Sequence, residues 1–176
     1  MCDKYLLFEY LVFRLNGWRS QLDNVNIVSF SKLRLQKILF LVCAYEATND
    51  DRKLLNVFDN FFALPYGPVE LDIYEAMNEK HSFRHIYFEG NNCVCNDMTD
   101  SLFEEIPKDE RSWVDEAINA FRNENKKYLT MPVFDLVEIT HKWTVWQVSM
   151  DIAKFLGSKK GIMQSEDICD SPVKFF

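Results

Sequence analysis

The chain has 176 residues, 48% of them hydrophobic and 15% aromatic, and a formal net charge of −7. This length and composition suffice for one substantial core, so a single domain over residues 1–176 is expected. Lys and Arg form no cluster of the kind that displaces counterions from a duplex, which disfavours nucleic-acid binding. Eight acids and only two bases lie between residues 97 and 116, a pattern typical of a solvated helix face.

The first expected helix covers about residues 3–15, an apolar stretch interrupted by Lys4, Glu9 and Arg14. The stretch is too short and too charged for a membrane span or a secretory signal, so we expect a buried helix. The sequence Asn16-Gly17 is typical of a helix C-terminus, and the helix is expected to end there.

A second helix is expected over about residues 32–47, after a turn-rich stretch at residues 18–29, with Ser29 or Ser31 as its N-cap. Apolar residues occur on nearly every side of this helix, as in helices that are surrounded by other elements. They are Leu33, Leu35, Ile38, Leu39, Phe40, Leu41, Val42, Cys43 and Ala44. A central position would bury Lys37, which must then find a partner or lie near an opening.

Residues 54–62 are rich in aromatic side chains and fit either a short helix or an extended segment. In the string that follows, Gly67 frees the backbone and Pro68 suits the first turn of a helix. We therefore expect a third helix over residues 68–79. Its start would present free backbone N–H groups to a carboxylate or phosphate beside Lys37.

Residues 83–88 and 93–95 flank the turn-forming residues 89–92, and this pattern predicts one short, peripheral β-hairpin. Cys93 and Cys95 would point to the same face of a strand, but no second pair of cysteines follows, so no metal site is expected. The five cysteines are irregularly spaced, which fits a reducing cytoplasm.

The C-terminal half is expected to be helical. Residues 111–126 have apolar side chains at helical spacing and acids on the opposite face, which predicts an amphipathic surface helix. Pro132 opens another helix, and Thr144 with Gln147 predicts the capped start of a further helix that ends at Gly157. The fold class is therefore mainly α: a compact multi-helix bundle around a central apolar helix, with one short peripheral β-hairpin.

Four short strings, far apart in the chain, form one larger pattern. They are KLRLQKILF at residues 32–40, FALPYGPV at 62–69, Leu136 followed by Thr140-His141 and Trp146, and SEDI at 165–168 before Phe175. In this order, over about residues 4–176, they resemble the Panacea domain of SocA-like antitoxins, formerly described as a domain of unknown function. One departure is Val145, which stands where the family pattern has a proline before Trp146.

The resemblance implies a single Panacea-type (SocA-like) domain over residues 1–176, in a cytoplasmic protein of bacterial or phage origin. It also implies an antitoxin that neutralises a neighbouring toxin, unrelated in sequence, by direct protein–protein binding. The expected partner is therefore a cognate protein toxin, and the oligomeric state is left open. Because the family has no established catalytic residue, neither enzymatic activity nor a cofactor is expected.

Polar residues in these strings lie within apolar surroundings, where an unpaired polar group costs roughly 1–3 kcal/mol. Such groups either satisfy one another in the fold or bind a ligand, and the sequence leaves both interpretations open. In the second interpretation, Lys37, Tyr66 and His141 converge on one cleft that binds a partner or a small ligand. The candidate polar cluster comprises Gln36, Lys37, Tyr66, Gly67, Pro68, Thr140, His141 and Trp146.

Two other functions are alternatives at this point. A phage or mobile-element regulator that binds nucleic acid would require a basic helix able to enter a groove. A small hydrolase or transferase would require an open cleft with Lys37, Tyr66 and His141 near a nucleophile. Cys43 is the thiol in the same neighbourhood, and its place on the central helix predicts burial and low reactivity.

Overall fold

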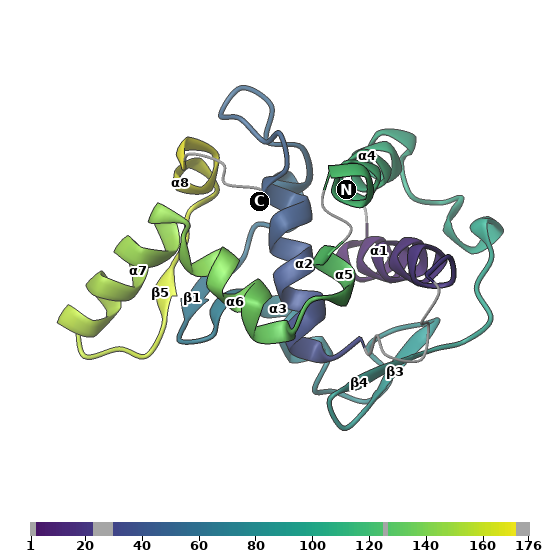
Figure 1. Cartoon of the computed structure of the whole chain (residues 1–176), viewed down its shortest axis with the longest axis horizontal. Helices are drawn as coiled ribbons and strands as arrows, with labels where there is room; N and C mark the ends of the chain where they lie inside the picture. The colour runs from purple at the N-terminus through teal and green to yellow at the C-terminus, as the bar shows by residue number, and fades with distance from the viewer. Residues whose placement is uncertain (1–2, 23–29, 125–126, 172–176) are drawn as a thin grey trace.

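The computed structural model describes residues 3–22, 30–124 and 127–171. Helix α2 (Lys32–Ala44) stands at its centre, with helices and strands on several sides of it (Figure 1). Eleven of the thirteen residues of α2 are buried, which confirms the expected central helix. The described part of the chain holds eight α-helices and two small antiparallel sheets, so the mainly α fold class is also confirmed.

Both ends of α2 have local causes. Ser31 Oγ accepts a hydrogen bond from Arg34 N–H at 3.2 Å, as expected of the N-cap, whereas Ser29 lies outside the described residues. The helix ends at Ala44 and not at residue 47, since Tyr45 has an extended backbone.

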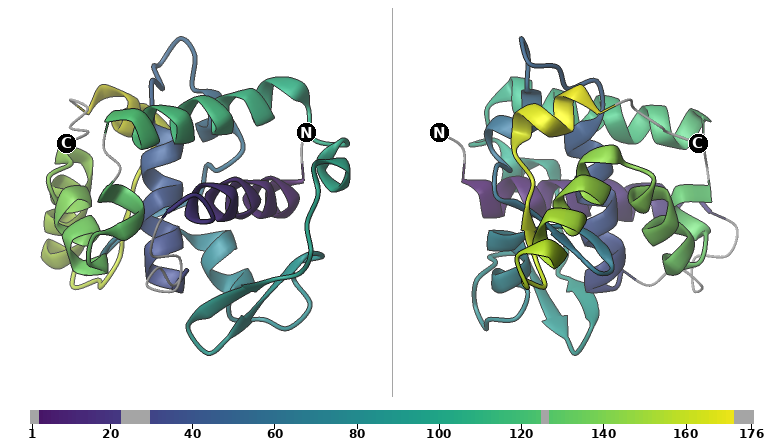
Figure 2. Two further views of the ribbon diagram at one scale, coloured as in Figure 1. Left: turned by 45° about the vertical axis from the view of Figure 1, so that its right-hand side comes forward. Right: turned by 90° about the vertical axis from the view of Figure 1, so that its left-hand side faces the viewer.

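Helices α1 (Lys4–Arg19) and α4 (Lys108–Glu124) both lie across α2 (Figure 2). Helix α1 does not end at Gly17 as expected but continues to Arg19. Trp18 is buried there, and burial of its large ring outweighs the cost of about 1 kcal/mol for a glycine inside a helix. The predicted amphipathic helix is confirmed as α4, whose buried residues are Val114, Ala117, Ile118 and Phe121.

A three-stranded sheet that the sequence did not indicate lies beside α2. Strand β1 (Phe61–Leu64) is its middle strand, paired antiparallel with β2 (Gly67–Glu70) on one side and with β5 (Gly161–Ile162) on the other. Gly161 is required in β5, because a Cβ atom there would lie 2.2 Å from the carbonyl oxygen of Ser149. The sheet is therefore pressed directly against α7 (Thr144–Phe155).

The helix predicted over residues 68–79 is consequently wrong over its first residues. The observed helix is α3 (Leu71–Ala76), and the carboxylate of Glu70 caps it by accepting a hydrogen bond from Ile73 N–H at 2.9 Å. Pro68 lies in β2 instead, which is permitted because β2 is an edge strand. The anion site expected at residue 68 is wrong for the same reason.

The predicted peripheral hairpin is confirmed as β3 (Ile86–Glu89) and β4 (Asn92–Cys95), which project from the bundle in Figure 1. Glu9 of α1 holds the base of this hairpin. Its buried carboxylate accepts hydrogen bonds from the backbone N–H groups of His85 at 2.6 Å and Ile86 at 3.2 Å. The hairpin is thus fixed to the first helix of the bundle.

After α4 the chain returns to the central helix α2 and packs on the side of it that α4 leaves uncovered (Figure 1). Thr144 does not cap α7 as predicted, since Trp143 is the N-cap residue and its side chain makes no capping bond.

None of the helices in the described ranges is long and apolar enough to cross a membrane. The remaining elements are the 3-10 turns η2 (Lys53–Asn56) and η3 (Asp100–Phe103), and the helices α5 (Lys127–Thr130), α6 (Val133–His141) and α8 (Ser165–Asp170).

An ion cluster joins the start of α1 to β2 and α3. Lys4 Nζ lies 2.8 Å from the Glu70 carboxylate, 2.6 Å from Asp72 and 3.1 Å from Asp59. The three carboxylates are close enough to one another to resemble a cation site, and the Lys4 ammonium supplies that cation. Glu70 is fully buried and its pKa is raised by burial, so its charge depends on this contact.

We expect Lys4→Met to lower the free energy of unfolding by about 3 kcal/mol, because it leaves the buried Glu70 carboxylate without its cation. The loss should be smaller at pH 5 than at pH 7.5, since burial raises the pKa of the Glu70 carboxyl and a larger fraction of it is neutral at the lower pH. Urea denaturation at both pH values measures this, and the double variant Lys4→Met/Glu70→Gln is the control that removes the charge. Equal losses at both pH values would contradict a raised pKa for Glu70.

Candidate functional site

Lys37 is the polar residue buried most deeply in the central helix. It has no exposed surface, and its Nζ donates a hydrogen bond to the carbonyl oxygen of Pro68 at 2.5 Å. Burial lowers the pKa of Lys37 to about 7. Within the described ranges Lys37 has no carboxylate partner. In the same ranges its Nζ is hydrogen-bonded only to a backbone carbonyl.

Gln36 binds the same strand from the preceding position of α2. Its Oε1 accepts a hydrogen bond from Glu70 N–H at 2.9 Å, and its Nε2 donates to the Glu70 carbonyl at 3.4 Å. The amide therefore satisfies both backbone groups of one residue on the free edge of β2, as a neighbouring strand would. Gln36 and Lys37 together join α2 to the β1–β2 hairpin.

Gly67 allows this hairpin to approach α2 and α6 closely. Its φ is +94°, and a Cβ atom would lie 2.5 Å from Thr140 Oγ1 and 3.1 Å from Lys37 Nζ. The Thr140 hydroxyl is fully buried and donates a hydrogen bond to the Val137 carbonyl at 2.8 Å. We call Gln36, Lys37, Gly67, Pro68 and Thr140 the Lys37 cluster.

His141 and Trp146 lie at the margin of the Lys37 cluster. Their rings are stacked, with centroids 3.8 Å apart and planes 12° apart, and Trp146 Nε1 donates a hydrogen bond to the Leu64 carbonyl at 3.0 Å. The pKa of His141 is lowered by burial, so the ring is neutral at pH 7. This pair fastens the start of α7 to the end of β1.

Tyr66 does not take part in this arrangement. Its side chain is 62% exposed, and its ring meets that of Phe134 edge to face with centroids 6.3 Å apart. The predicted meeting of Lys37, Tyr66 and His141 is therefore wrong for the tyrosine. The structure brings Lys37 together with Gly67, Pro68 and Thr140, places His141 and Trp146 beside them, and leaves Tyr66 outside.

The Lys37 cluster leaves little room for a ligand or for catalysis. None of the main concave regions on the described part of the chain is lined by a residue of this cluster or by His141. The Cys43 thiol on α2 is fully buried, and burial raises its pKa, so it stays protonated. The hydrogen bonds of Gln36 and Lys37 join α2 to β2, and that of Thr140 lies within α6.

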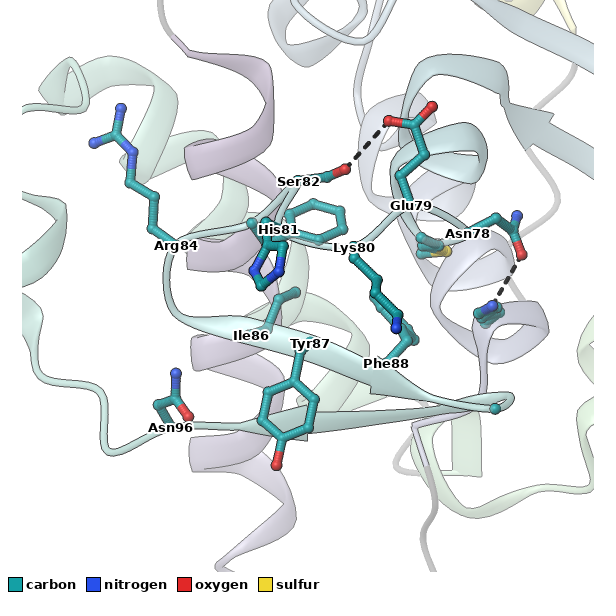
Figure 3. Close-up of a pocket in the computed structure, with 14 residues that line it drawn as sticks. Asn78, Glu79, Lys80, His81, Ser82, Arg84, Ile86, Tyr87, Phe88 and Asn96 are labelled. Atoms are coloured by element: carbon teal, nitrogen blue, oxygen red, sulfur yellow. Dashed lines mark hydrogen bonds between the residues drawn. The ribbon is translucent and has the colours of Figure 1, made fainter.

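Two surface features stand outside the expected site. The first is a groove of about 620 Å³ between residues 77–84 and the β3–β4 hairpin (Figure 3). The second, which we call the α7 face, borders a concavity of about 300 Å³ and consists of Val148, Ile152, Phe155, Leu156 and Ile162. Sequence reasoning missed both, although the helical spacing of the apolar residues in α7 was a usable signal.

These features define a class of protein: a small, mainly α-helical fold with a buried polar centre beside its central helix. The chain matches the family described as "Antitoxin SocA-like, Panacea domain" over residues 35–147, and it belongs to that family. The matched residues include the whole of the Lys37 cluster. Comparisons with curated proteins and with solved structures gave no match.

Gly67→Ala should lower the free energy of unfolding by about 3 kcal/mol, since a side chain at this φ is strained and also collides with Thr140. Gly157→Ala is the matched control, because Gly157 has a φ of +70° but no atom lies within 4 Å of the place that the added methyl group would take. Its loss should be about 1 kcal/mol, from backbone strain alone. Equal losses in urea denaturation would show that the close approach at Gly67 costs nothing.

Lys37→Met tests the buried ammonium through pH. Unfolded lysine binds its proton up to about pH 10.5, whereas folded Lys37 releases it near pH 7, so the unfolded state binds more protons between these values. Wild-type stability should therefore rise relative to Lys37→Met across this window, by up to about 1.4 kcal/mol per pH unit. Chemical denaturation of both proteins from pH 6.5 to 9.5 measures the difference, and a constant difference would contradict the lowered pKa.

Proposed function

We propose that this protein is an antitoxin that neutralises a cognate protein toxin by binding it directly and covering its active surface. Membership of the SocA-like family supports the antitoxin role. The proposed setting is the bacterial cytoplasm, whose reducing conditions suit the free thiols of Cys43, Cys93, Cys95 and Cys169. The function is one of binding and requires neither a catalytic group nor a cofactor.

The observation that carries direct binding is the α7 face. Val148, Ile152 and Phe155 follow one side of α7 at helical spacing, and the side chain of Phe155 is 89% exposed. Leu156 continues this stripe, and Ile162 of β5 adjoins it across the concavity. A contiguous group of large apolar side chains on a soluble domain is typical of a protein-binding surface.

The concavity at one end of the α7 face is acidic, whereas exposed lysines lie along the chain near Phe155 and Leu156 at the other end, namely Lys154, Lys159 and Lys160. Asp167 and Asp170 line the concavity beside it, whereas no Lys or Arg of the described chain lines it. These carboxylates would repel a phosphate backbone, but they suit basic residues at the rim of a toxin interface. A nucleic-acid-binding regulator, the main alternative, would need the opposite charge at the concavity.

We expect the neighbouring gene to encode the toxin. Its expression alone should stop growth, co-expression of this chain should restore growth, and the two proteins should elute as one complex from a gel-filtration column. Rescue without a complex would contradict neutralisation by direct binding. A neighbour that does not affect growth would remove the antitoxin proposal for this pair.

The double variant Ile152→Asp/Phe155→Asp should abolish rescue and weaken binding at least about thirtyfold, since central apolar contacts in an interface are often worth about 2 kcal/mol or more. Both side chains are exposed, so the melting temperature should not change. Tyr74→Asp, an exposed aromatic residue on α3, is the matched control and should rescue normally. Full rescue by the double variant would place the interface elsewhere.

A further inference from the structure

Helix α7 and the β3–β4 hairpin lie toward opposite ends of the molecule in Figure 1, and the groove of about 620 Å³ lies beside the hairpin. Its two walls are the segment from Asn78 to Arg84 and strand β3, as Figure 3 shows. The volume of about 620 Å³ is within the range of binding sites for small ligands and short peptides. No residue of the Lys37 cluster or of the α7 face lines this groove.

The outer edge of strand β3 is unpaired at one described residue, Phe88. Phe88 is opposite Cys93 in the hairpin, but Cys93 N–H donates its hydrogen bond away from β3, to the Phe30 carbonyl at 2.9 Å. Phe88 and Cys93 are therefore a non-hydrogen-bonded pair, so the N–H and C=O of Phe88 point to the outer edge of β3. Ile86, two residues earlier, uses the same edge to donate to Glu9.

The groove is cationic although the protein is acidic. Lys32, Lys80 and Arg84 line it against the single carboxylate of Glu79, while the whole chain carries −7. Arg84 is already paired with Asp3 and Glu105. Lys80 makes no hydrogen bond or ion pair with any described residue, so its ammonium is available.

Apolar contact surface adjoins these charges. Tyr87 of β3 is about half-exposed, and the ring of Phe88 lies 5.7 Å from Lys32 Nζ. The Lys32 ammonium covers part of the Phe88 ring, so a ligand would meet the lysine charge together with the remaining exposed surface of Phe88 and with Tyr87. The groove therefore combines a strand edge, the ammonium of Lys80, which is unpaired among the described residues, the ammonium of Lys32, which donates a hydrogen bond to Asn78 Oδ1 at 2.9 Å, and aromatic walls.

We propose that this groove binds an extended, acidic peptide segment of a partner protein, added as a strand along β3. The peptide backbone pairs with the N–H and C=O of Phe88, its carboxylates contact Lys32 and Lys80, and its apolar side chains pack on Tyr87 and Phe88. A small phosphorylated ligand would use the same lysines but would leave the strand edge unpaired. The strand edge is therefore the reason for choosing a peptide.

The test uses the full chain and a fluorescein-labelled peptide in which Val alternates with Asp and Glu, with binding followed by fluorescence anisotropy. A dissociation constant of about 10–100 µM is expected, weakening as salt is raised. Two further peptides are the comparison: one with Lys in place of each acid, and one with alternate backbone nitrogens methylated. Both should bind at least about tenfold more weakly, because they lose the charge contacts and the strand pairing respectively.

Lys32→Glu/Lys80→Glu should weaken binding of the acidic peptide at least about tenfold. Lys108→Glu/Lys159→Glu makes the same change in net charge away from the groove, and Lys108, like Lys32, is the first residue of a helix. The control should bind as the wild type does. Equal effects of the two variants, or equal binding of the lysine or methylated peptide, would overturn the proposal.

Self-association is a further outcome that the same variants distinguish. If the wild-type chain is a dimer in gel filtration and Lys32→Glu/Lys80→Glu is a monomer, the groove binds a second copy, and the proposal of a different partner is overturned. Neither result bears on toxin neutralisation, because the groove and the α7 face are separate surfaces.

Discussion

The fold depends on how an apolar helix satisfies the backbone of a buried edge strand. Strand β2 is fully buried, yet β1 is the only described strand that pairs with it, so the outward backbone groups of β2 need other partners. Gln36 supplies two of these partners and Lys37 a third. Because each such buried group left unpaired would cost about 1–3 kcal/mol, two polar residues in the middle of α2 stabilise the domain.

Burying Lys37 without a carboxylate partner costs free energy that its one hydrogen bond to a carbonyl offsets only in part. We infer that its role is to specify one arrangement of the β1–β2 hairpin. The ammonium reaches Pro68 only when Gly67 lies against Thr140, where any larger residue would collide. A shift of one residue in the β1–β2 pairing would bring a side chain to that point and move Pro68 away from Lys37. The hydrogen bond from the buried Lys37 amino group to Pro68 therefore favours the observed register of the hairpin.

The features that sequence reasoning predicted correctly have local signals. The spacing of Val114, Ala117, Ile118 and Phe121 indicates α4, and the turn at residues 89–92 indicates the β3–β4 hairpin. The β1–β2 hairpin was missed because Gly-Pro suits a helix start as well as a turn, and the decisive contacts come from Gln36, more than thirty residues earlier. The outward direction of Tyr66, whose ring contacts that of Phe134 on α6, is likewise not indicated by any local pattern.

The family match covers residues 35–147, which hold most of the buried centre of the fold. Residues 35–147 contain the Lys37 cluster and the stacked pair of His141 and Trp146, which are contacts that hold the fold together. The α7 face begins at Val148, so all five of its residues lie beyond the matched region. Substitutions on the α7 face would leave the hydrogen bonds from Gln36 and Lys37 to the buried β1–β2 hairpin in place, because none of the five residues of that face takes part in them.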